Sequence, residues 1–282
     1  MQLAQPAADV PASAPETPFK LHRRFDRTGR LIGDAGMQRL DQARVIVFGL
    51  GGVGSYAVEG LVRSGVGHLT LVDFDVVCVT NSNRQLHATV SGVGKPKAEL
   101  LAQRCKQINP DVSVEPVVDF YRAEVSEQML AGRWDFVVDA VDNVKAKLHL
   151  LHQCVSRRIP VVSSMGAAAR LDPTYIRVDD LCETHMDPLA KDVRKLLKRK
   201  YGLDTSQPTG ITAVYSIEPR REPQPLRYDE AQGGFACVCP HGANEFHSCE
   251  ERNQIDGSVA FVTSVFGMQM AGVVVRRIAQ GR

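Results

Sequence analysis

One glycine-rich segment constrains the fold of this chain more than any other feature. An apolar run at 45–48 is typical of a buried strand, and the glycines that follow it contain the pattern G-x-G-x-x-G. A second apolar stretch then ends at Asp73. Glycines at this spacing permit a tight turn from strand to helix and let backbone N–H groups approach phosphate oxygens, while the carboxylate can accept hydrogen bonds from a ribose. The segment predicts half of a nucleotide-binding Rossmann fold, with candidate contacts at Gly49, Gly51, Gly52, Gly54 and Asp73.

Three charged residues follow this segment at positions that suit a triphosphate. Arg84 lies in a polar stretch, Lys97 opens a predicted helix that runs to about residue 108, and Asp142 follows a predicted strand. In a doubly wound sheet, such positions lie beyond the C-terminal ends of the strands, around one crevice. The two cations would neutralise phosphate oxygens, and the carboxylate would hold Mg²⁺ directly or through water. We therefore expect ATP with magnesium; a nicotinamide-dependent oxidoreductase, the more distant alternative, would leave these three catalytic candidates without a role.

The same motifs resemble those of the ubiquitin-activating-enzyme-like superfamily, which includes ThiF, MoeB and HesA, over about residues 23–180. The matching segments are R-F-D-R at 24–27, the glycine loop, L-V-D-F-D at 71–75, N-S-N-R-Q at 81–85, G-K-P-K at 94–97 and D-A-V-D-N at 139–143. The resemblance implies an enzyme that uses ATP and magnesium to adenylate a carboxylate. It also implies a homodimer in which Arg27 reaches the partner subunit's nucleotide, and it adds Asp75, Asn81 and Asn143 to the ATP site.

Within that superfamily, three segments resemble the tRNA threonylcarbamoyladenosine dehydratases. These segments are the N-x-N-R-Q motif, A-A-A-R-L-D-P-T at 167–174, and D-P-L-A at 187–190 before a basic helix. The resemblance implies that a threonyl carboxylate beside the tRNA anticodon becomes an acyl-adenylate, which the neighbouring ureido group attacks with loss of water. The alternative is an adenylyltransferase that activates the C-terminus of a ubiquitin-like sulfur-carrier protein. The paired C-x-x-C motifs that bind zinc in such activators are absent from this chain.

Alternating strands and helices predict an α/β fold with a Rossmann-like, doubly wound and mostly parallel sheet. We expect an adenylating domain over 21–282, with a nucleotide half at about 40–165 and a smaller C-terminal lobe for substrate and dimer contacts at about 166–282. The Ala/Pro-rich residues 1–20 lack the cationic start and apolar core of a signal peptide, so we expect a disordered tail. Seven cysteines without a secreted framework favour the cytoplasm.

A predicted helix at 187–201 carries the strongest indication of nucleic-acid binding. Its basic residues recur at three- and four-residue spacing, so they share one face, with apolar residues on the other. The net charge of the chain is only +2, so any binding to nucleic acid depends on such a local patch. A solvated helix face has the same pattern. With the resemblance, we expect tRNA contacts from Lys191, Arg194, Lys195, Lys198 and Arg199.

The cysteines allow two further sites, neither of which the spacing favours. Cys237, Cys239 and Cys249 lie close to two histidines and could hold zinc, but C-x-C is poorer than C-x-x-C for a shared ion, so we favour unbound thiols. Cys182 lies where related activators can carry a transferring thiol. No base is evident near it in the sequence, so we expect a structural role. Whether a cysteine-desulfurase sulfur-transfer system is a partner stays open.

The uncharged stretch 257–275 approaches the length of a membrane span. It carries several polar residues, however, and the small residues Gly267 and Ala271 would let helices approach closely. We therefore expect a helix in the core or at a dimer interface, and no stable insertion into a membrane.

Overall fold

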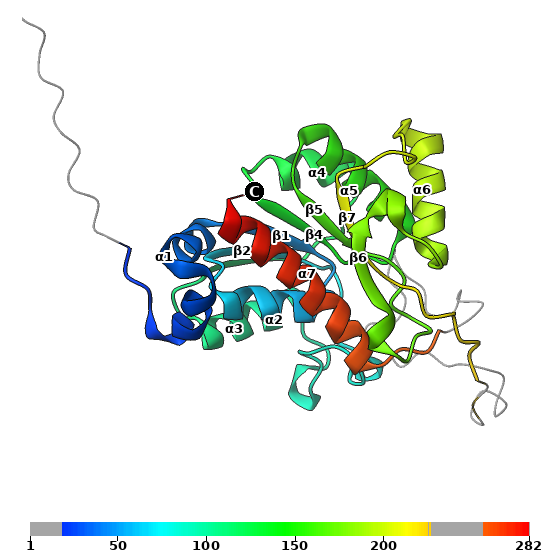
Figure 1. The fold of residues 1–282 in the computed structure, drawn as a ribbon. Helices are drawn as coiled ribbons and strands as arrows, with labels where there is room; N and C mark the ends of the chain where they lie inside the picture. Colours follow the sequence, from blue (N-terminus) through cyan, green and yellow to red (C-terminus); the bar gives the residue numbers. More distant parts are fainter. Residues whose placement is uncertain (1–18, 225, 227–255, 282) are drawn as a thin grey trace, which may run out of the picture.

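A seven-stranded sheet organises the described residues, which in this computed structural model are 19–224, 226 and 256–281. The strand order is β3-β2-β1-β4-β5-β7-β6, and every neighbouring pair is parallel except β6 and β7 (Figure 1). The strands are β1 (Arg44–Phe48), β2 (His68–Val72), β3 (Ser113–Val117), β4 (Phe136–Asp139), β5 (Val161–Ser164), β6 (Ile176–Asp180) and β7 (Ile211–Ser216). The order reverses between β1 and β4, which confirms the predicted doubly wound, mostly parallel sheet.

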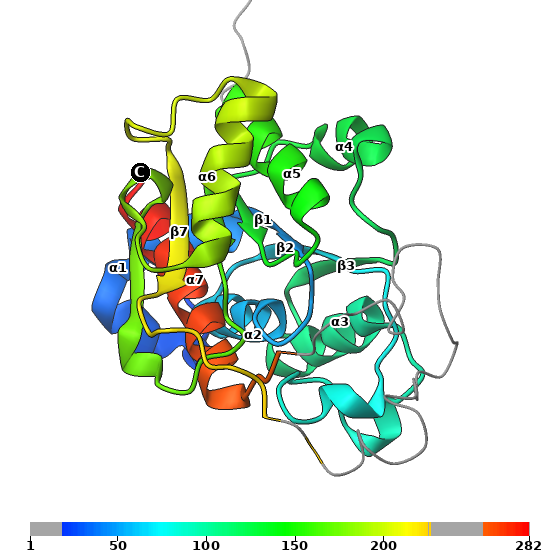
Figure 2. The same cartoon turned by 90° about the vertical axis from the view of Figure 1, so that its right-hand side faces the viewer.

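Helices cover both faces of this sheet, as Figures 1 and 2 show from two directions. Their bounds are α1 (Asp26–Gln42), α2 (Gly54–Ser64), α3 (Lys97–Ile108), α4 (Ala123–Leu130), α5 (Val144–Arg157), α6 (Pro188–Tyr201) and α7 (Ala260–Gln280). Alternate residues of β1 point to opposite faces, because Val45 and Val47 pack with α1, α2, α3 and α7, whereas Ile46 and Phe48 pack with α4, α5 and α6. The apolar run at 45–48 is therefore buried on both sides.

Helix α7 is the expected apolar helix, and its inner face lies in the core. By length and composition it could span a membrane, yet it packs along α2 with very little space between the two helices. A Cβ on Gly267 would lie 2.3 Å from the Val53 carbonyl oxygen, and one on Gly60 would lie 2.6 Å from the Ala271 Cβ. These close contacts confirm that the small residues permit tight packing.

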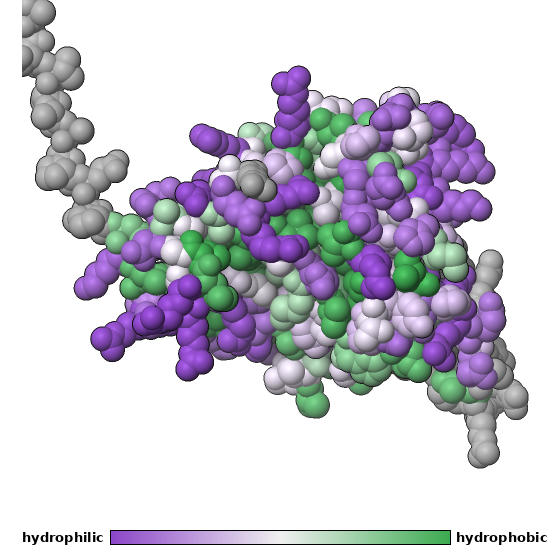
Figure 3. All heavy atoms as spheres, viewed as in Figure 1, coloured by the Kyte–Doolittle hydropathy of each residue, from purple (hydrophilic) through white to green (hydrophobic). Residues whose placement is uncertain are grey.

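The C-terminal end of α7 contacts α1, and its outer side faces solvent. At the C-terminal end, the guanidinium of Arg39 on α1 donates to the carbonyl oxygens of Ile278 and Ala279, at 3.2 and 3.1 Å from its Nε. On the outer side, Phe261 and Met268 are 49% and 43% exposed. Apolar side chains gather on the face of the molecule where α7 lies (Figure 3). The helix thus has a buried side against α2 and an apolar side in solvent.

Residues of the expected C-terminal lobe extend the same sheet in the part of the chain that the structure describes. Strand β7 pairs with β5, and β6 forms the edge beyond it. Helix α6 packs beside α5 on one face, while α7 covers the other. Two predicted features lie outside the described residues. They are the expected disordered tail, apart from residues 19 and 20, and the segment with Cys237, Cys239 and Cys249.

Candidate active site

The glycine loop between β1 and α2 is tight enough to require two of its glycines. Gly49 has φ +83°, and a Cβ there would lie 2.6 Å from the Ala140 carbonyl oxygen. A Cβ on Gly54 would lie only 1.8 Å from the Gly49 carbonyl oxygen. The amides of Gly51, Gly52 and Gly54 donate no hydrogen bond to any described residue. The start of α2 therefore leaves backbone donors free at a position that suits an anion.

Asp73, at the end of β2, ties this loop to the sheet. Its Oδ2 accepts a hydrogen bond from the Leu50 amide at 2.6 Å, and its Oδ1 accepts one from the Asp75 amide at 2.8 Å. Burial raises the pKa of Asp73, although the charge of Lys97 lowers it in part. A carboxylate has about four acceptor sites, so two remain for the predicted ribose contact. The structure thus gives Asp73 a first role that the sequence did not indicate, which is to hold the loop.

Lys97 brings the charged residues of the site together. Its side chain is buried at the start of α3, and its Nζ lies 2.8 Å from Asp75 Oδ2. Burial would lower the pKa of Lys97, but the nearby carboxylates of Asp73, Asp75 and Asp142 together raise it. Lys97 therefore carries its charge at neutral pH. Residues after β2 and β4 thus place their negative charges around the lysine that begins α3.

Asp142 and Asn143 follow β4 and differ in how they are held. Asp142 is exposed and makes no hydrogen bond or ion pair with a described residue. Asn143 accepts a hydrogen bond from the Ala146 amide at 3.0 Å and so forms the N-cap of α5. Asn143 is therefore committed to capping through its side-chain oxygen, whereas the Asp142 carboxylate is available to a ligand.

A magnesium ion would fit Asp142 only together with a nucleotide. Among the described residues, no group of three or more His, Cys, Asp or Glu side chains could hold a metal. Mg²⁺ is commonly bound by one or two carboxylates, with phosphate oxygens and waters as its other ligands. A single free carboxylate beside a phosphate loop matches that donor set.

The polar segment 81–85 lies against the glycine loop. Asn81 is buried, and its Oδ1 accepts from the Cys78 amide at 3.0 Å. Arg84 donates to the Thr80 carbonyl oxygen at 3.0 Å, and a Cβ on Gly52 would lie 3.2 Å from the Arg84 Cγ. The side-chain oxygen of Gln85 is buried and accepts no hydrogen bond from a described residue. Such an atom beside the loop indicates that a bound group completes the site.

Sequence reasoning missed a buried ion pair beneath the site. Lys147 on α5 donates to Asp139 Oδ2 at 2.6 Å and to the Ser164 carbonyl oxygen at 3.0 Å, and both charged side chains are fully buried. Asp139 Oδ1 also accepts from the Val141 amide at 3.1 Å. The pair thus fixes the turn that carries Asp142. Its signal in the sequence is a lysine at a core position of α5, in helical register with Leu151 and other buried apolar residues.

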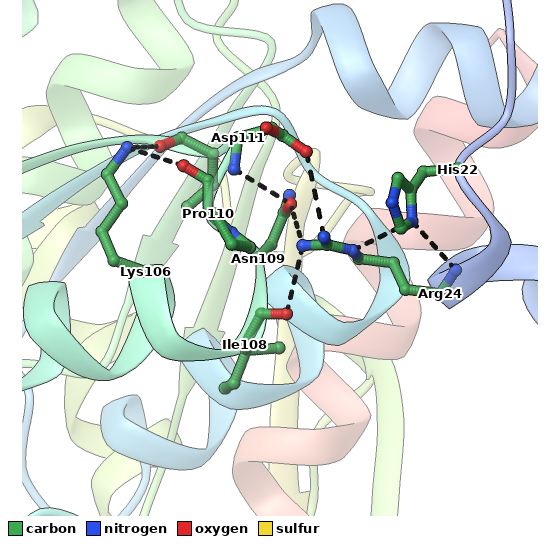
Figure 4. A network of polar contacts seen from close by, with 8 residues as sticks. His22, Arg24, Lys106, Ile108, Asn109, Pro110 and Asp111 are labelled. Atoms are coloured by element: carbon green, nitrogen blue, oxygen red, sulfur yellow. Dashed lines mark hydrogen bonds and ion pairs between the residues drawn. The ribbon is translucent and has the colours of Figure 1, made fainter.

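The N-terminal arm is anchored by Arg24, three residues before Arg27 (Figure 4). Arg24 donates to Asn109 Oδ1 at 2.8 Å and to the Ile108 carbonyl oxygen at 3.4 Å, and its Nε donates to His22 Nδ1 at 3.1 Å. Arg27 is exposed on the first turn of α1 and makes no hydrogen bond or ion pair with a described residue. The arm is thus held in place while the Arg27 guanidinium stays in solvent.

Four of the five side chains of α6 that we expect to contact tRNA are exposed to solvent. Lys191, Lys195, Lys198 and Arg199 are exposed on the face opposite the buried Val193 and Leu197. Arg194 is the exception, because its guanidinium donates to the Thr184 hydroxyl and to the carbonyl oxygens of Thr184 and Leu181. In this structure its side chain secures the turn before α6, and its contact with tRNA stays a prediction.

Cys182 is held as a thiol. Partial burial, followed by the carboxylates of Asp180 and Glu183, raises the pKa of its side chain to about 11. The thiolate is the nucleophilic form, so this cysteine is a poor nucleophile at neutral pH. The observation supports a structural role.

The mostly parallel sheet, the glycine loop and the charges around it define a Rossmann-type α/β protein with a candidate anion site at its switch point. The chain belongs to the ThiF family, whose family model matches residues 25–281.

The sequence and the structure are both similar to the tRNA threonylcarbamoyladenosine dehydratases of that family. The chain is 42% identical over 255 residues to the tRNA threonylcarbamoyladenosine dehydratase of Bacillus subtilis, covering 90% of this chain and 94% of that protein. The crystal structure of the Escherichia coli enzyme TcdA in complex with ATP has a TM-score of 0.78 at 34% identity, covering 92% and 95% of the two chains. Its complex with AMP has a TM-score of 0.77 at 35% identity. A Salmonella typhimurium molybdopterin-synthase adenylyltransferase is 38% identical over 137 residues, which is 49% of this chain.

Proposed function

We propose that this chain is an ATP-dependent tRNA threonylcarbamoyladenosine dehydratase that forms AMP and pyrophosphate. One observation carries the chemistry: the charged Lys97 and the free Asp142 carboxylate lie at the same edge of the sheet as the glycine loop. The similarity to dehydratases over nine-tenths of the chain supports the substrate, because it includes the C-terminal half. The similarity to an adenylyltransferase of another class covers only about half of the chain.

The first half-reaction is adenylation of the threonyl carboxylate. A carboxylate oxygen attacks the α-phosphorus of ATP, the bond to the β-phosphate breaks, and pyrophosphate leaves with the electron pair. Lys97 and the free amides of Gly51 and Gly52 stabilise charge on the phosphates. Arg84 joins them when its guanidinium exchanges the Thr80 carbonyl oxygen for a phosphate oxygen. Asp142 would hold Mg²⁺, which supplies further charge neutralisation at the departing pyrophosphate.

The second half-reaction is ring closure. The ureido nitrogen of the same nucleoside attacks the acyl carbon, AMP leaves, and the nitrogen loses its proton. Because the step is intramolecular, its effective concentration is high and no enzyme nucleophile is required. The described cysteines agree with this scheme. The thiol of Cys182 has a pKa of about 11, and burial raises the pKa of Cys105 and Cys154 to about 12.

The active enzyme is a homodimer in this proposal. Arg27 stands in solvent on an anchored arm, and the outer side of α7 presents an apolar stripe around Phe261 and Met268. A two-fold interface would present the same stripe from both subunits. Arg27 would then complete the nucleotide site of the partner subunit.

The exposed stripe of α6 binds the tRNA backbone. Four cations on one helix face suit a row of phosphates, and they leave recognition of the modified adenosine to the crevice. A tRNA substrate places the enzyme in the cytoplasm.

The decisive experiment measures pyrophosphate release in three parallel reactions: with tRNA that carries threonylcarbamoyladenosine, with a sulfur-carrier protein, and with neither. We expect release only with the modified tRNA, together with loss of one water from its nucleoside, which mass spectrometry of the digested tRNA detects. The same tRNA without the modification is the matched control. Release that requires the carrier protein would refute the proposal in favour of the alternative.

A further inference from the structure

Arg170 is a buried arginine that has no partner in the part of the chain that the structure describes. It is 4% exposed, and its buried Nε and Nη1 make no hydrogen bond with any described residue. A guanidinium is always charged and carries five N–H donors. Burying such donors unpaired costs far more than burying an apolar side chain. A buried arginine of this kind therefore indicates a group that binds to it.

Three other buried charges have such a partner. Lys97 pairs with Asp75, Lys147 pairs with Asp139, and the buried Glu59 accepts hydrogen bonds from Arg104 and Arg63. Arg170 differs from these residues because none of the described carboxylates lies within ion-pair distance of it.

The carboxylate of Asp187 is near Arg170, but among the described residues no hydrogen bond or ion pair joins the two side chains. Burial raises the pKa of Asp187, and the charge of Arg170 lowers it in part, so the two side chains are near each other. Asp187 Oδ1 accepts from the Ala190 amide at 2.9 Å, and Oδ2 accepts from the Gly166 amide at 3.1 Å. Asp187 therefore caps α6 and holds the loop after β5, and it accepts no hydrogen bond from Arg170.

The backbone before Arg170 is held in an unusual conformation. Ala169 has φ +59°, a left-handed conformation that is unfavourable for alanine. Hydrogen bonds on both sides hold it there: its N–H donates to the Gly257 carbonyl oxygen at 2.7 Å, and its carbonyl oxygen accepts from the Arg221 amide at 3.0 Å. Strain that is held in this way commonly marks a residue with a defined task.

The loop of Arg170 lies close to the nucleotide site. It leaves the C-terminal end of β5, beside the end of β4 that leads to Asp142. Gly257, which accepts the hydrogen bond of Ala169, is followed by Ser258, whose carbonyl oxygen accepts from Asn83 Nδ2 at 2.8 Å. Asn83 belongs to the polar segment 81–85 that lies against the glycine loop. A Cβ on Gly52 would lie 3.2 Å from Oγ1 of Thr263, which follows shortly after Ser258 in the chain. One short segment thus connects Arg170 to the glycine loop.

We propose that Arg170 binds the carboxylate of the threonyl group and so selects the modified nucleoside. A guanidinium and a carboxylate can form two parallel hydrogen bonds, which fix both the position and the orientation of the reacting oxygens. The inference rests on the proposed function. It adds that the substrate carboxylate has a dedicated partner outside the ATP site, on the loop after β5.

The test compares the affinity of the enzyme for two tRNAs, without ATP. One carries threonylcarbamoyladenosine, and the other is the same tRNA without the modification. The wild type should prefer the modified tRNA. Arg170→Gln should weaken binding of the modified tRNA on the order of tenfold to a hundredfold, and it should leave binding of the unmodified tRNA and of ATP unchanged. Arg177→Gln is the matched control, because Arg177 is exposed and, among the described residues, bonds only the carbonyl oxygens of Thr174 and Ile176.

An unchanged preference in Arg170→Gln would overturn the inference. Equal weakening of both tRNAs would also overturn it, since that outcome indicates a contact with a phosphate. If Arg170→Gln does not fold, wild-type enzyme is tested with tRNA whose threonyl carboxylate is converted to an amide; equal affinity for acid and amide overturns the inference as well. Failure of the wild type to cyclise modified tRNA with ATP would refute the proposed function itself. Normal cyclisation by the wild type, together with an unchanged tRNA preference in Arg170→Gln, would refute this inference alone.

Discussion

The Lys97 ammonium lies 2.8 Å from the Asp75 carboxylate, with 7% of the lysine side chain and 33% of the aspartate side chain exposed. This pair holds a positive charge in place before any phosphate enters. Lys97 has three N–H donors, so two remain when one is bound to Asp75. Charge that is positioned in advance needs no reorganisation during the reaction, which is the usual source of electrostatic catalysis.

Lys97→Met should lower the rate of pyrophosphate release on the order of a hundredfold or more, because it removes a positioned charge from the transition state. Single-turnover kinetics with modified tRNA would measure this effect. Lys106→Met is the matched control on the same helix, since Lys106 bonds only the carbonyl oxygens of Pro110 and Val112. Comparable rates for the two variants would remove Lys97 from the mechanism.

Two aspartates near the end of β4 should respond differently to substitution. Asp142→Ala should abolish adenylation without changing the melting temperature, because the Asp142 side chain has no described partner. Asp139→Ala should destabilise the protein by about 3–5 kcal/mol, because it leaves Lys147 buried and unpaired. Thermal unfolding and pyrophosphate release, measured on both variants, separate the two roles. Normal turnover by Asp142→Ala would contradict the proposed site.

Mixed dimers test whether Arg27 acts on the partner subunit. Arg27→Ala and Asp142→Ala enzymes should each be inactive, yet their mixture should regain part of the activity. In a mixed dimer one site carries both lesions and the other carries neither. Native mass spectrometry would confirm that mixed dimers form. Confirmed mixed dimers without any activity would rule out a shared site.

The exposed stripe of α6 should set the salt dependence of tRNA binding. Replacing both Lys195 and Arg199 by glutamate should weaken binding and flatten the log–log salt dependence by about 0.7–0.9 for each lost contact. ATP binding should not change. Arg194→Ala serves as a contrast within the same helix: it should lower the melting temperature and leave the salt dependence intact, because Arg194 bonds the turn before α6. If the double variant binds tRNA as the wild type does, the tRNA approaches another surface.

His87 should make stability depend on pH. Burial, with a further contribution from the charge of Lys97, lowers the pKa of His87 from 6.5 to about 4. The unfolded chain therefore binds more protons than the folded protein between these values, and stability falls as the pH decreases. From pH 7 to pH 5 this group should remove about 2 kcal/mol from the free energy of unfolding.

Urea unfolding of His87→Phe at both pH values would measure this contribution. The variant should lack that part of the pH dependence, because its ring has no proton to bind. A substitution of the exposed His68 by glutamine is the control. The same pH dependence in His87→Phe and in the wild type would show that His87 does not titrate as described.

The sequence was sufficient to predict those features that depend on local pattern. The glycine loop could be placed because Gly49 and Gly54 are needed wherever a strand turns this tightly into a helix. The position of Lys97 followed from helix α3, which begins at that residue. Both conclusions need only residues that are neighbours along the chain or the order of strands in a parallel sheet.

The remaining features depend on contacts between distant residues. Arg194 belongs to the basic pattern of α6, but its environment is set by the carbonyl oxygens of Thr184 and Leu181, ten and more residues away. Lys147 reads as one more surface lysine until its partner Asp139 is placed beside it. The unpaired donors of Arg170 are likewise visible only in the structure, which places no acceptor of a described residue within hydrogen-bond distance of its Nε and Nη1.

Helix α7 separates two surfaces that the proposed enzyme uses for different purposes. Its inner side touches α2 near the glycine loop, and its outer side is the apolar stripe that a second subunit would cover. Only the width of one helix therefore lies between the nucleotide and the partner. In the proposed dimer Arg27 of one subunit contacts the nucleotide of the other, so ligand binding and subunit association are thermodynamically linked, and each changes the affinity of the other by the same factor. The affinity of the subunits for each other should accordingly differ between the ATP-bound and the nucleotide-free enzyme.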